Sequence, residues 1–214
     1  GLALVCHEDR LARQLAAEMR EAPFEILSYG TDPEANYQAQ AVEIVQGLPN
    51  FKLYFQEPSG TKQTFGHTHL SLPGKHNVLN ATAVLGVIHQ LGLPLEKAME
   101  ALGSFTGAGR RFEILGQAGG VTLIDDYGHH PTEITATLEA ARSRFPDSQI
   151  RAVWQPHTYS RTRILESDFI QALNKADRVV VLKIYAARER DPGYSAEKIV
   201  NALPSGKAMY YHDF

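Results

Sequence analysis

The second half of the chain alternates between short apolar runs and amphipathic segments, and this alternation limits the possible folds more than any other feature. Apolar runs at 121–124, 150–155, 178–185 and 208–214 are separated by helical patterns at 131–145, 163–176 and 195–203. Apolar strands that are separated by amphipathic helices are typical of a parallel sheet with right-handed crossovers. The sequence therefore predicts a Rossmann-like α/β domain with a mainly parallel sheet.

A glycine-rich connector precedes this region. Residues 103–109 contain three glycines in seven positions, which is typical of a flexible link, so we predict domains at 1–107 and 108–214. Gly107 and Gly109 do not form a dinucleotide-binding fingerprint, because no strand precedes them and a third glycine is missing.

The first half is predicted to be a mixed α/β unit. Its expected strands are 2–6 and 24–28, with a helix at 8–21 whose Leu11, Leu15 and Met19 recur at fourfold spacing. Alternating segments at 51–55 and 61–72 indicate an antiparallel hairpin or meander. Two further helices are expected, one carrying Val78, Ala81, Thr82, Leu85 and Ile88 on its inner face, and one beginning at Pro94 with Leu95, Ala98, Met99 and Leu102 turned inward.

Composition excludes several classes of partner. Lys and Arg total 21 against 24 Asp and Glu, so there is no basic field for nucleic acid or an anionic membrane. The single cysteine, Cys6, excludes an intrachain disulfide and suits a reducing compartment. Because the sequence has no membrane-spanning stretch and no signal peptide, we expect a cytoplasmic protein. It opens inside a strand-like run without Met, and we expect a fragment of a longer protein.

Polar clusters follow three of the predicted strands, at 125–130, 155–162 and 185–190. In open parallel sheets, ligands bind beyond the carboxyl ends of the strands, where neighbouring loops converge. These three loops therefore predict a pocket at one edge of the sheet.

The stretch "DDYGHHPTEI" (125–134) has a structural and a functional interpretation. Pro131 and Glu133 fit the first turn of a helix. The start of a helix does not explain the polar residues that precede it at 125–130. Two adjacent acids also repel each other, and one of them would be enough to cap a helix. We therefore favour a functional site formed by Asp125, Asp126, Tyr127, His129 and His130.

Two more stretches carry candidates. In "QPHTYSRT" (155–162), Ser160 or Thr162 fits a helix N-cap. Capping would not require His157, Tyr159, Arg161 and Arg163, and arginines at a helix start make better sense facing an anion.

In "HNVLN" (76–80), Asn77 and Asn80 lie on one helical face. There they could cap the helix or bind a base edge, and spacing alone does not decide between these roles. His67 and His69 read as ordinary hairpin residues.

Four separated motifs together resemble the Mur ligase family. They are "PGKHNVLNATA" (73–83), "GRRFEILG" (109–116), "DDYGHHPTEI" (125–134) and "QPHTYSRTR" (155–163). The resemblance implies three domains, of which this chain would hold part of the central ATP-binding domain and most of a truncated C-terminal one. It also implies an acyl-phosphate intermediate and ATP with Mg²⁺, and it points to the branch that joins L-alanine to UDP-N-acetylmuramate in peptidoglycan synthesis.

The resemblance also assigns roles to individual residues. The nucleotide-binding residues would be His76, Asn77, Asn80, Arg111 and Asp126. Catalytic roles would fall to Asp126, His129 and Arg111. The substrate side would be lined by Tyr127, His129, His130, His157, Tyr159 and Arg161. No metal ligand is assigned in this chain, because the magnesium ligands are expected upstream of it.

One departure from the family pattern stands out. The phosphate-loop pattern G-x-x-x-x-G-K-[ST] is absent, because Gly74 and Lys75 are followed by His76. We therefore expect the chain to be inactive alone. Three alternatives remain open: a ligase of the same family that attaches recycled tripeptide, a metal-dependent phosphoesterase built on the Asp and His pairs, and a nucleotide-binding module without chemistry. The oligomeric state is not predicted.

Overall fold

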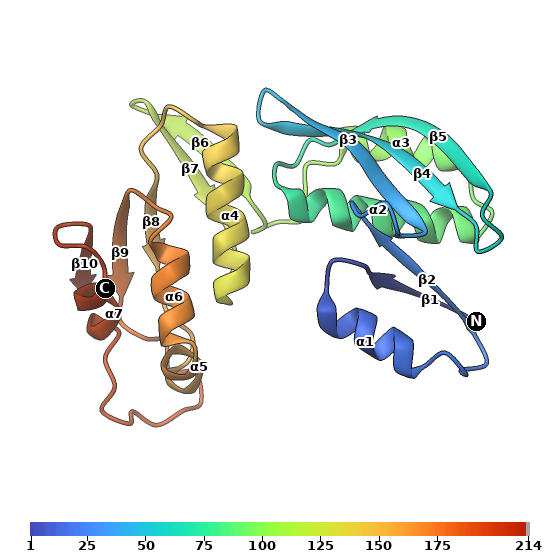
Figure 1. Cartoon of the computed structure of the whole chain (residues 1–214). Helices are drawn as coiled ribbons and strands as arrows, with labels where there is room; N and C mark the ends of the chain where they lie inside the picture. Colours follow the sequence, from blue (N-terminus) through green and yellow to red (C-terminus); the bar gives the residue numbers. More distant parts are fainter. Residues whose placement is uncertain (213–214) are drawn as a thin grey trace. The chain divides into compact units, whose positions relative to one another are not determined.

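A computed structural model describes residues 1–212, and the chain divides into two compact units with the boundary between Gly107 and Ala108 (Figure 1). The expected strand at 208–214 extends beyond the described residues at its last two positions. Within residues 1–212, no helix combines the length and apolarity that crossing a membrane requires.

The first unit is built on a five-stranded mixed sheet, in the order β1-β2-β3-β4-β5. Neighbours pair in parallel from β1 to β3 and antiparallel from β3 to β5. The strands are β1 (Leu2–Cys6), β2 (Glu25–Gly30), β3 (Tyr37–Val45), β4 (Leu48–Gln56) and β5 (Lys62–His69). The expected mixed sheet with an antiparallel part is confirmed, with one strand, β3, that sequence reasoning missed.

Buried and exposed residues do not alternate along β3, which explains why this strand was missed. Its first three residues are all buried, whereas its last five are exposed. The signal that marks it is the turn that follows. Gln46 and Gly47 have φ values of 51° and 78°, as a two-residue hairpin turn requires, so β3 and β4 pair as neighbours.

Three helices accompany this sheet: α1 (Arg10–Glu18), α2 (Lys75–Gln90) and α3 (Leu95–Ser104). The inner face of α2 is buried as predicted at Val78, Ala81, Thr82 and Leu85. The fourfold spacing in α1 does not mark a buried face, because Leu11 and Leu15 are 66% and 55% exposed and no residue of α1 is buried.

The second unit contains a three-stranded, all-parallel sheet in the order β10-β9-β8. Its strands are β8 (Arg151–Trp154), β9 (Arg178–Leu182) and β10 (Ala208–Tyr211), and its helices are α4 (Pro131–Arg144), α5 (Tyr159–Ile164), α6 (Glu166–Leu173) and α7 (Glu197–Ala202). The predicted parallel α/β arrangement is confirmed. One helix was expected at 163–176, but the structure has two, α5 and α6, which meet at Leu165. The first of them begins earlier than expected, at Tyr159.

The run at 121–124 lies outside this parallel ladder, contrary to prediction. Strands β6 (Glu113–Ala118) and β7 (Val121–Asp125) form a separate antiparallel hairpin. Gly119 and Gly120 have φ values of 55° and 77°, so the chain reverses within two residues and β7 pairs back onto β6. Ile124 and Phe112 pack against α4 and anchor the hairpin there.

Candidate functional site

The first turn of α4 is fixed by a reciprocal capping arrangement. His130 is the N-cap, and its Nδ1 accepts a hydrogen bond from the backbone N–H of Thr132 at 3.3 Å. The Glu133 carboxylate accepts the backbone N–H groups of His129 at 2.9 Å and of His130 at 3.1 Å. His130 therefore has a structural role, which sequence reasoning did not assign to it.

Glu133 also connects the helix start to Arg111. The Arg111 Nη1 lies 3.5 Å from the Glu133 Oε1. Burial by itself would raise the pKa of Glu133, but the backbone N–H groups of His129 and His130, with the charges of His129 and Arg111, hold that pKa below its ordinary value. Glu133 thus stays ionised and orients Arg111. Sequence reasoning took it only for a helix-start residue, although glutamate three positions after an N-cap signals this arrangement.

Asp126 binds backbone groups on two sides. Its Oδ2 accepts the N–H of Phe112 at 2.9 Å, and its Oδ1 accepts the N–H of Gly128 at 2.7 Å. A Cβ on Gly128 would come within 2.8 Å of that Oδ1, so a larger residue here would push the Asp126 carboxylate away from the Gly128 N–H. Asp125 points elsewhere and pairs with Arg110 at 3.2 Å. The two adjacent acids therefore have separate partners, which relieves the expected repulsion.

The segment that carries Arg111 is held in an unfavourable backbone conformation. Arg110 and Phe112, on either side of it, have φ values of 61° and 49°. Such left-handed positions cost about 1–2 kcal/mol per residue and persist where the surroundings fix them. Here Asp126 binds the N–H of Phe112, and Glu113 binds that of Arg110 at 2.7 Å. The strain is therefore stored around Arg111.

Tyr127 and His129 complete this group. The Tyr127 ring is 53% exposed, with the Arg110 guanidinium 5.0 Å and the Arg111 guanidinium 5.9 Å from its centroid. The His129 ring meets Tyr127 edge-on at 5.5 Å. The structure thus brings the predicted residues Arg111, Asp126, Tyr127, His129 and His130 together with Glu133, and we call these six the Arg111 cluster.

The loops after β8 and β9 also lie together, as the sequence predicts for neighbouring parallel strands. The N–H of Tyr185 donates to the carbonyl of Pro156 at 2.8 Å, and the rings of His157 and Tyr185 stack at 5.4 Å. The Arg161 Nη1 donates to the carbonyl of His157 at 3.1 Å. His157 and Arg161 are thus close to each other. The third loop of the predicted pocket, at 125–130, follows the hairpin strand β7 and therefore does not lie at the end of a strand of this sheet.

Two expectations about this loop need correction. Tyr159 is only 7% exposed and packs into the core of the second unit, so its ring does not line an open site. Burial and the nearby Asp191 carboxylate raise the pKa of its hydroxyl. Neither Ser160 nor Thr162 is the N-cap of α5. Thr158 holds that position, and the Thr162 hydroxyl donates to the carbonyl of Thr158 at 2.6 Å.

Glu189 fastens the two loops to each other. Its carboxylate accepts the Thr158 hydroxyl at 2.6 Å, the Ser160 N–H at 2.9 Å and the Ser160 hydroxyl. The Ser160 hydroxyl, followed by the Thr158 hydroxyl and the Ser160 N–H, lowers the pKa of Glu189 to about 2. We call Thr158, Ser160 and Glu189 the Glu189 clasp.

This arrangement predicts an unusual titration. We expect the side-chain carboxyl ¹³C signal of Glu189 to titrate near pH 2 instead of the ordinary 4.5, and Ser160→Ala to move the midpoint upward. Because the folded-state pKa is the lower one, the clasp contributes fully above about pH 4.5 and is lost as the pH falls toward 2. Ser205→Ala, an exposed serine in a turn, is the matched control and leaves the midpoint unchanged. An ordinary midpoint in the wild-type chain would contradict the clasp.

In the first unit, Asn77 and Asn80 share a face of α2 as predicted. The Asn77 Nδ2 donates to the carbonyl of Pro73 at 2.8 Å, and the Asn77 Oδ1 lies 3.5 Å from the Asn80 Nδ2. The N-cap is Gly74, with a φ of 100° and no side-chain cap, so Asn77 is not the cap. His76 lies on the same first turn. The two amides therefore remain the candidate base-edge ligands.

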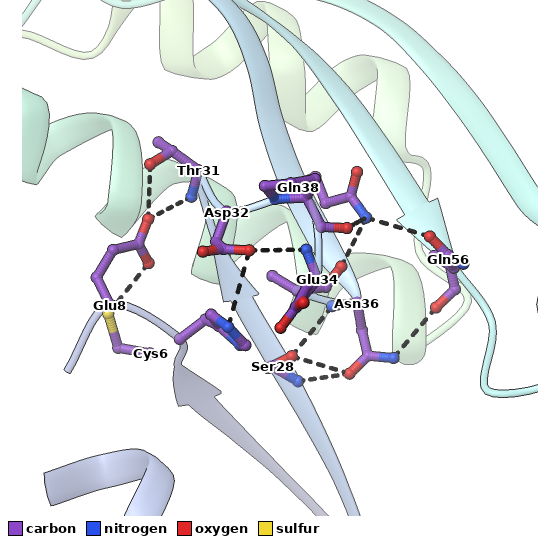
Figure 2. A network of polar contacts seen from close by, with 12 residues as sticks. Cys6, Glu8, Ser28, Thr31, Asp32, Glu34, Asn36, Gln38 and Gln56 are labelled. Atoms are coloured by element: carbon purple, nitrogen blue, oxygen red, sulfur yellow. Dashed lines mark hydrogen bonds and ion pairs between the residues drawn. The ribbon is translucent and has the colours of Figure 1, made fainter. Parts of the chain in front are cut away.

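A second polar network lies where β1 and β2 end (Figure 2). Glu8 accepts the hydroxyl of Thr31 at 2.7 Å, and Asn36 joins β2 to β4 through Ser28 and the carbonyl of Gln56. A Cβ on Gly30 would overlap the Glu8 carboxylate, so a larger residue at the end of β2 would displace that carboxylate from its bonds to Thr31. The network fixes the loop from Thr31 to Asn36.

That loop contributes to a group of potential metal ligands, His7, Asp32 and Glu34. It is the single group of this kind in residues 1–212, and none of the Asp and His residues of 125–130 belongs to it. The His7 Nε2 and the Asp32 Oδ1 are 3.9 Å apart, wider than the roughly 3.4 Å between two ligand atoms that each lie about 2.1 Å from a tetrahedral ion. The contact is an ion pair when His7 is protonated. No predicted site residue belongs to this group.

Comparisons with known proteins cover nearly the whole chain. A model of the Mur ligase middle domain matches residues 1–88, and a model described as "Mur ligase, glutamate ligase domain" matches residues 110–214. The UDP-N-acetylmuramate--L-alanine ligase of Caldanaerobacter subterraneus is 40% identical over 100% of this chain and 45% of its own length. The ligase of that name from Thermobifida fusca is 42% identical over 96% of the chain and 44% of its own length.

Solved structures agree in fold. The UDP-N-acetylmuramate-alanine ligase of Thermotoga maritima superposes with a TM-score of 0.75 at 29% identity, covering 99% of this chain and 43% of that one. Folylpolyglutamate synthase of Mycobacterium tuberculosis, complexed with ADP, shares the fold at 18% identity with a TM-score of 0.73, covering 99% and 45%. The chain thus spans less than half the length of these relatives.

Proposed function

Because the chain belongs to the Mur ligase family, we propose that it is part of an ATP-dependent ligase that joins L-alanine to UDP-N-acetylmuramate in peptidoglycan precursor synthesis. The observation that carries the proposal is identity of about 40% along the whole chain to relatives with that name. We assign residues 1–107 to the central domain and the unit from Ala108 onward to the C-terminal domain. The unpaired thiol of Cys6 suits a cytoplasmic enzyme.

The chemistry explains why such a site needs fixed cations. An amine does not displace oxide from a carboxylate, so ATP supplies the phosphoryl group that makes a better leaving group. The Arg111 guanidinium has five N–H donors in a planar fork, and Glu133 engages one end of it. We assign Arg111 to the negative charge that develops on the reacting groups, with Asp126 and Glu133 holding it in place.

The amide side chains at the start of α2 fit the base of a nucleotide. Asn77 and Asn80 offer amide donors and acceptors side by side on α2, which suits the edge of an adenine base, and His76 lies on the same turn. We assign these three residues to the nucleotide. Mg²⁺ belongs to the proposal as the usual companion of ATP, and no residue of this chain is assigned to it.

The substrate side is assigned to the polar groups of the second unit. Tyr127 and His129 of the Arg111 cluster, with His157 and Arg161 of the loop after β8, provide cationic and aromatic contacts for carboxylate and amine groups. The Nδ1 of His130 is occupied by the capping bond, so only its Nε2 is offered to a substrate.

The proposal is tested with the full-length protein that contains this chain. Incubation with ATP, UDP-N-acetylmuramate and L-alanine is expected to release phosphate and to give the alanyl product by mass spectrometry. A protein that accepts the tripeptide but not L-alanine is the recycling ligase instead. If neither L-alanine nor the tripeptide is turned over, the ligase proposal is contradicted. The 214-residue chain alone, which contains no G-x-x-x-x-G-K-[ST] sequence, is expected to release no phosphate.

A further inference from the structure

The helix α5 depends on another loop for its cap. Its N-cap, Thr158, makes no side-chain capping bond within the helix. The N–H of Ser160 in the first turn donates instead to Glu189, which lies 29 residues further along the chain in the loop after β9. A negative charge at this position also interacts favourably with the helix dipole. The start of α5 is therefore stabilised by a tertiary contact.

The residues fixed by this contact are the ones proposed to bind substrate. Thr158 follows His157 directly, and Arg161 lies one position beyond Ser160. The Arg161 guanidinium donates back to the carbonyl of His157, so the two side chains are coupled through the turn that Glu189 holds. Tyr185, from the same loop as Glu189, stacks on the His157 ring. Movement of Glu189 would therefore displace both candidate substrate ligands.

The carboxylate is well suited to a permanent structural role. Both of its oxygens accept hydrogen bonds, from two hydroxyl groups and one backbone N–H. Hydrogen bonds to an ionised acceptor are about twice as strong as those between neutral groups. The low pKa noted above keeps Glu189 charged throughout the physiological range.

We propose that Glu189 is a positioning residue for the substrate side of the ligase, which caps α5 from the neighbouring loop and thereby presents His157 and Arg161 to an anionic substrate. The proposal rests on the proposed function for its catalytic consequence. Its structural part, the dependence of the α5 start on Glu189, is independent of which reaction the protein performs.

Steady-state kinetics of the full-length protein test the catalytic part. Glu189→Gln keeps the shape of the side chain but removes the charge, and we expect the KM for L-alanine or UDP-N-acetylmuramate to rise roughly tenfold, with the KM for ATP within about twofold of the wild type. General destabilisation would lower the maximal rate without this selectivity. An unchanged KM for both substrates, or an equal loss for all three, overturns the proposal.

A matched control is available in the same unit. Glu197 is an exposed carboxylate in the first turn of α7, so Glu197→Gln makes the same charge change and is expected to leave all three KM values unchanged. A double variant, Thr158→Val with Ser160→Ala, removes the hydroxyl donors. When this double variant is combined with Glu189→Gln, the KM values are expected to be close to those of Glu189→Gln alone, because all three residues act through one contact. Fully additive effects overturn the proposal.

Hydrogen exchange on the 214-residue chain separates this proposal from the ligase proposal. We expect the Ser160 amide to exchange roughly tenfold faster in Glu189→Gln, with the fluorescence of Trp154, in the core of the same unit, confirming an intact fold. If the full-length wild type shows no ligase activity, the proposed function fails, and the exchange rate still decides the role of Glu189. Unchanged protection of Ser160 overturns that role.

Discussion

Replacing Asp126 by asparagine in the full-length protein is expected to lower the ligase rate by roughly 100-fold or more. The Oδ2 of Asp126 accepts the N–H of Phe112, and the bond holds the strained backbone on which Arg111 is carried. Asparagine has an NH₂ group where aspartate has its second carboxylate oxygen. One of the two backbone N–H groups, that of Phe112 or that of Gly128, would then face a donor instead of an acceptor. Arg111 then shifts, and a displacement of about 1 Å at a reacting centre can cost this much.

The control for this prediction is an aspartate outside the proposed site. Asp147 is exposed in the turn after α4, at the other end of that helix, so Asp147→Asn makes the same chemical change and is expected to retain near-normal turnover. If Asp126 acts through Arg111, the double variant with Arg111→Ala will be no slower than the slower single variant. Normal turnover of Asp126→Asn removes this residue from the proposed site.

Phe169→Ala is expected to destabilise the second unit by about 3–5 kcal/mol. Phe169 is fully buried, and its ring centroid lies 4.7 Å from that of Trp154 within the main core of this unit. Truncation removes the buried ring and leaves a cavity that the packed neighbours fill only in part. Since Trp154 is the single tryptophan of the chain, urea unfolding followed by its fluorescence reports on this unit.

Ile164→Ala is the matched control for this core substitution. Ile164 ends α5 and is 74% exposed, so its truncation is expected to change the free energy of unfolding by less than about 0.5 kcal/mol. A loss below about 1 kcal/mol for Phe169→Ala would show that this core is not packed as described.

The fold was predictable where the signal is periodic along the chain. The buried face of α2 and the strands β8 and β9 follow from apolar spacing, which depends only on local sequence. The β6–β7 hairpin was not predicted, because an apolar run does not reveal its partner strand. The signal present was Gly119-Gly120, a two-residue turn that directs β7 back onto β6.

The sequence could predict candidate site residues, but not the contacts that each of them makes. The motifs identified Arg111, Asp126 and His129, and the structure brings them together. Sequence reasoning placed Tyr159 on the substrate side, whereas its ring is buried, because helix α5 begins earlier than its apolar pattern suggests. It also gave no role to Glu189, whose partners lie about 30 residues away along the chain.

By itself, the sequence determined the α/β class, the glycine-rich boundary and the stretches that carry the polar chemistry, because strand and helix periodicity and turn residues are local properties. The tertiary structure alone decided what each polar side chain binds. The pairing of β8 with β9 places the Glu189 loop against the start of α5, and the packing of the β6–β7 hairpin on α4 brings Arg111 to Glu133. These partners are set by which strands lie side by side, and no local pattern encodes that adjacency.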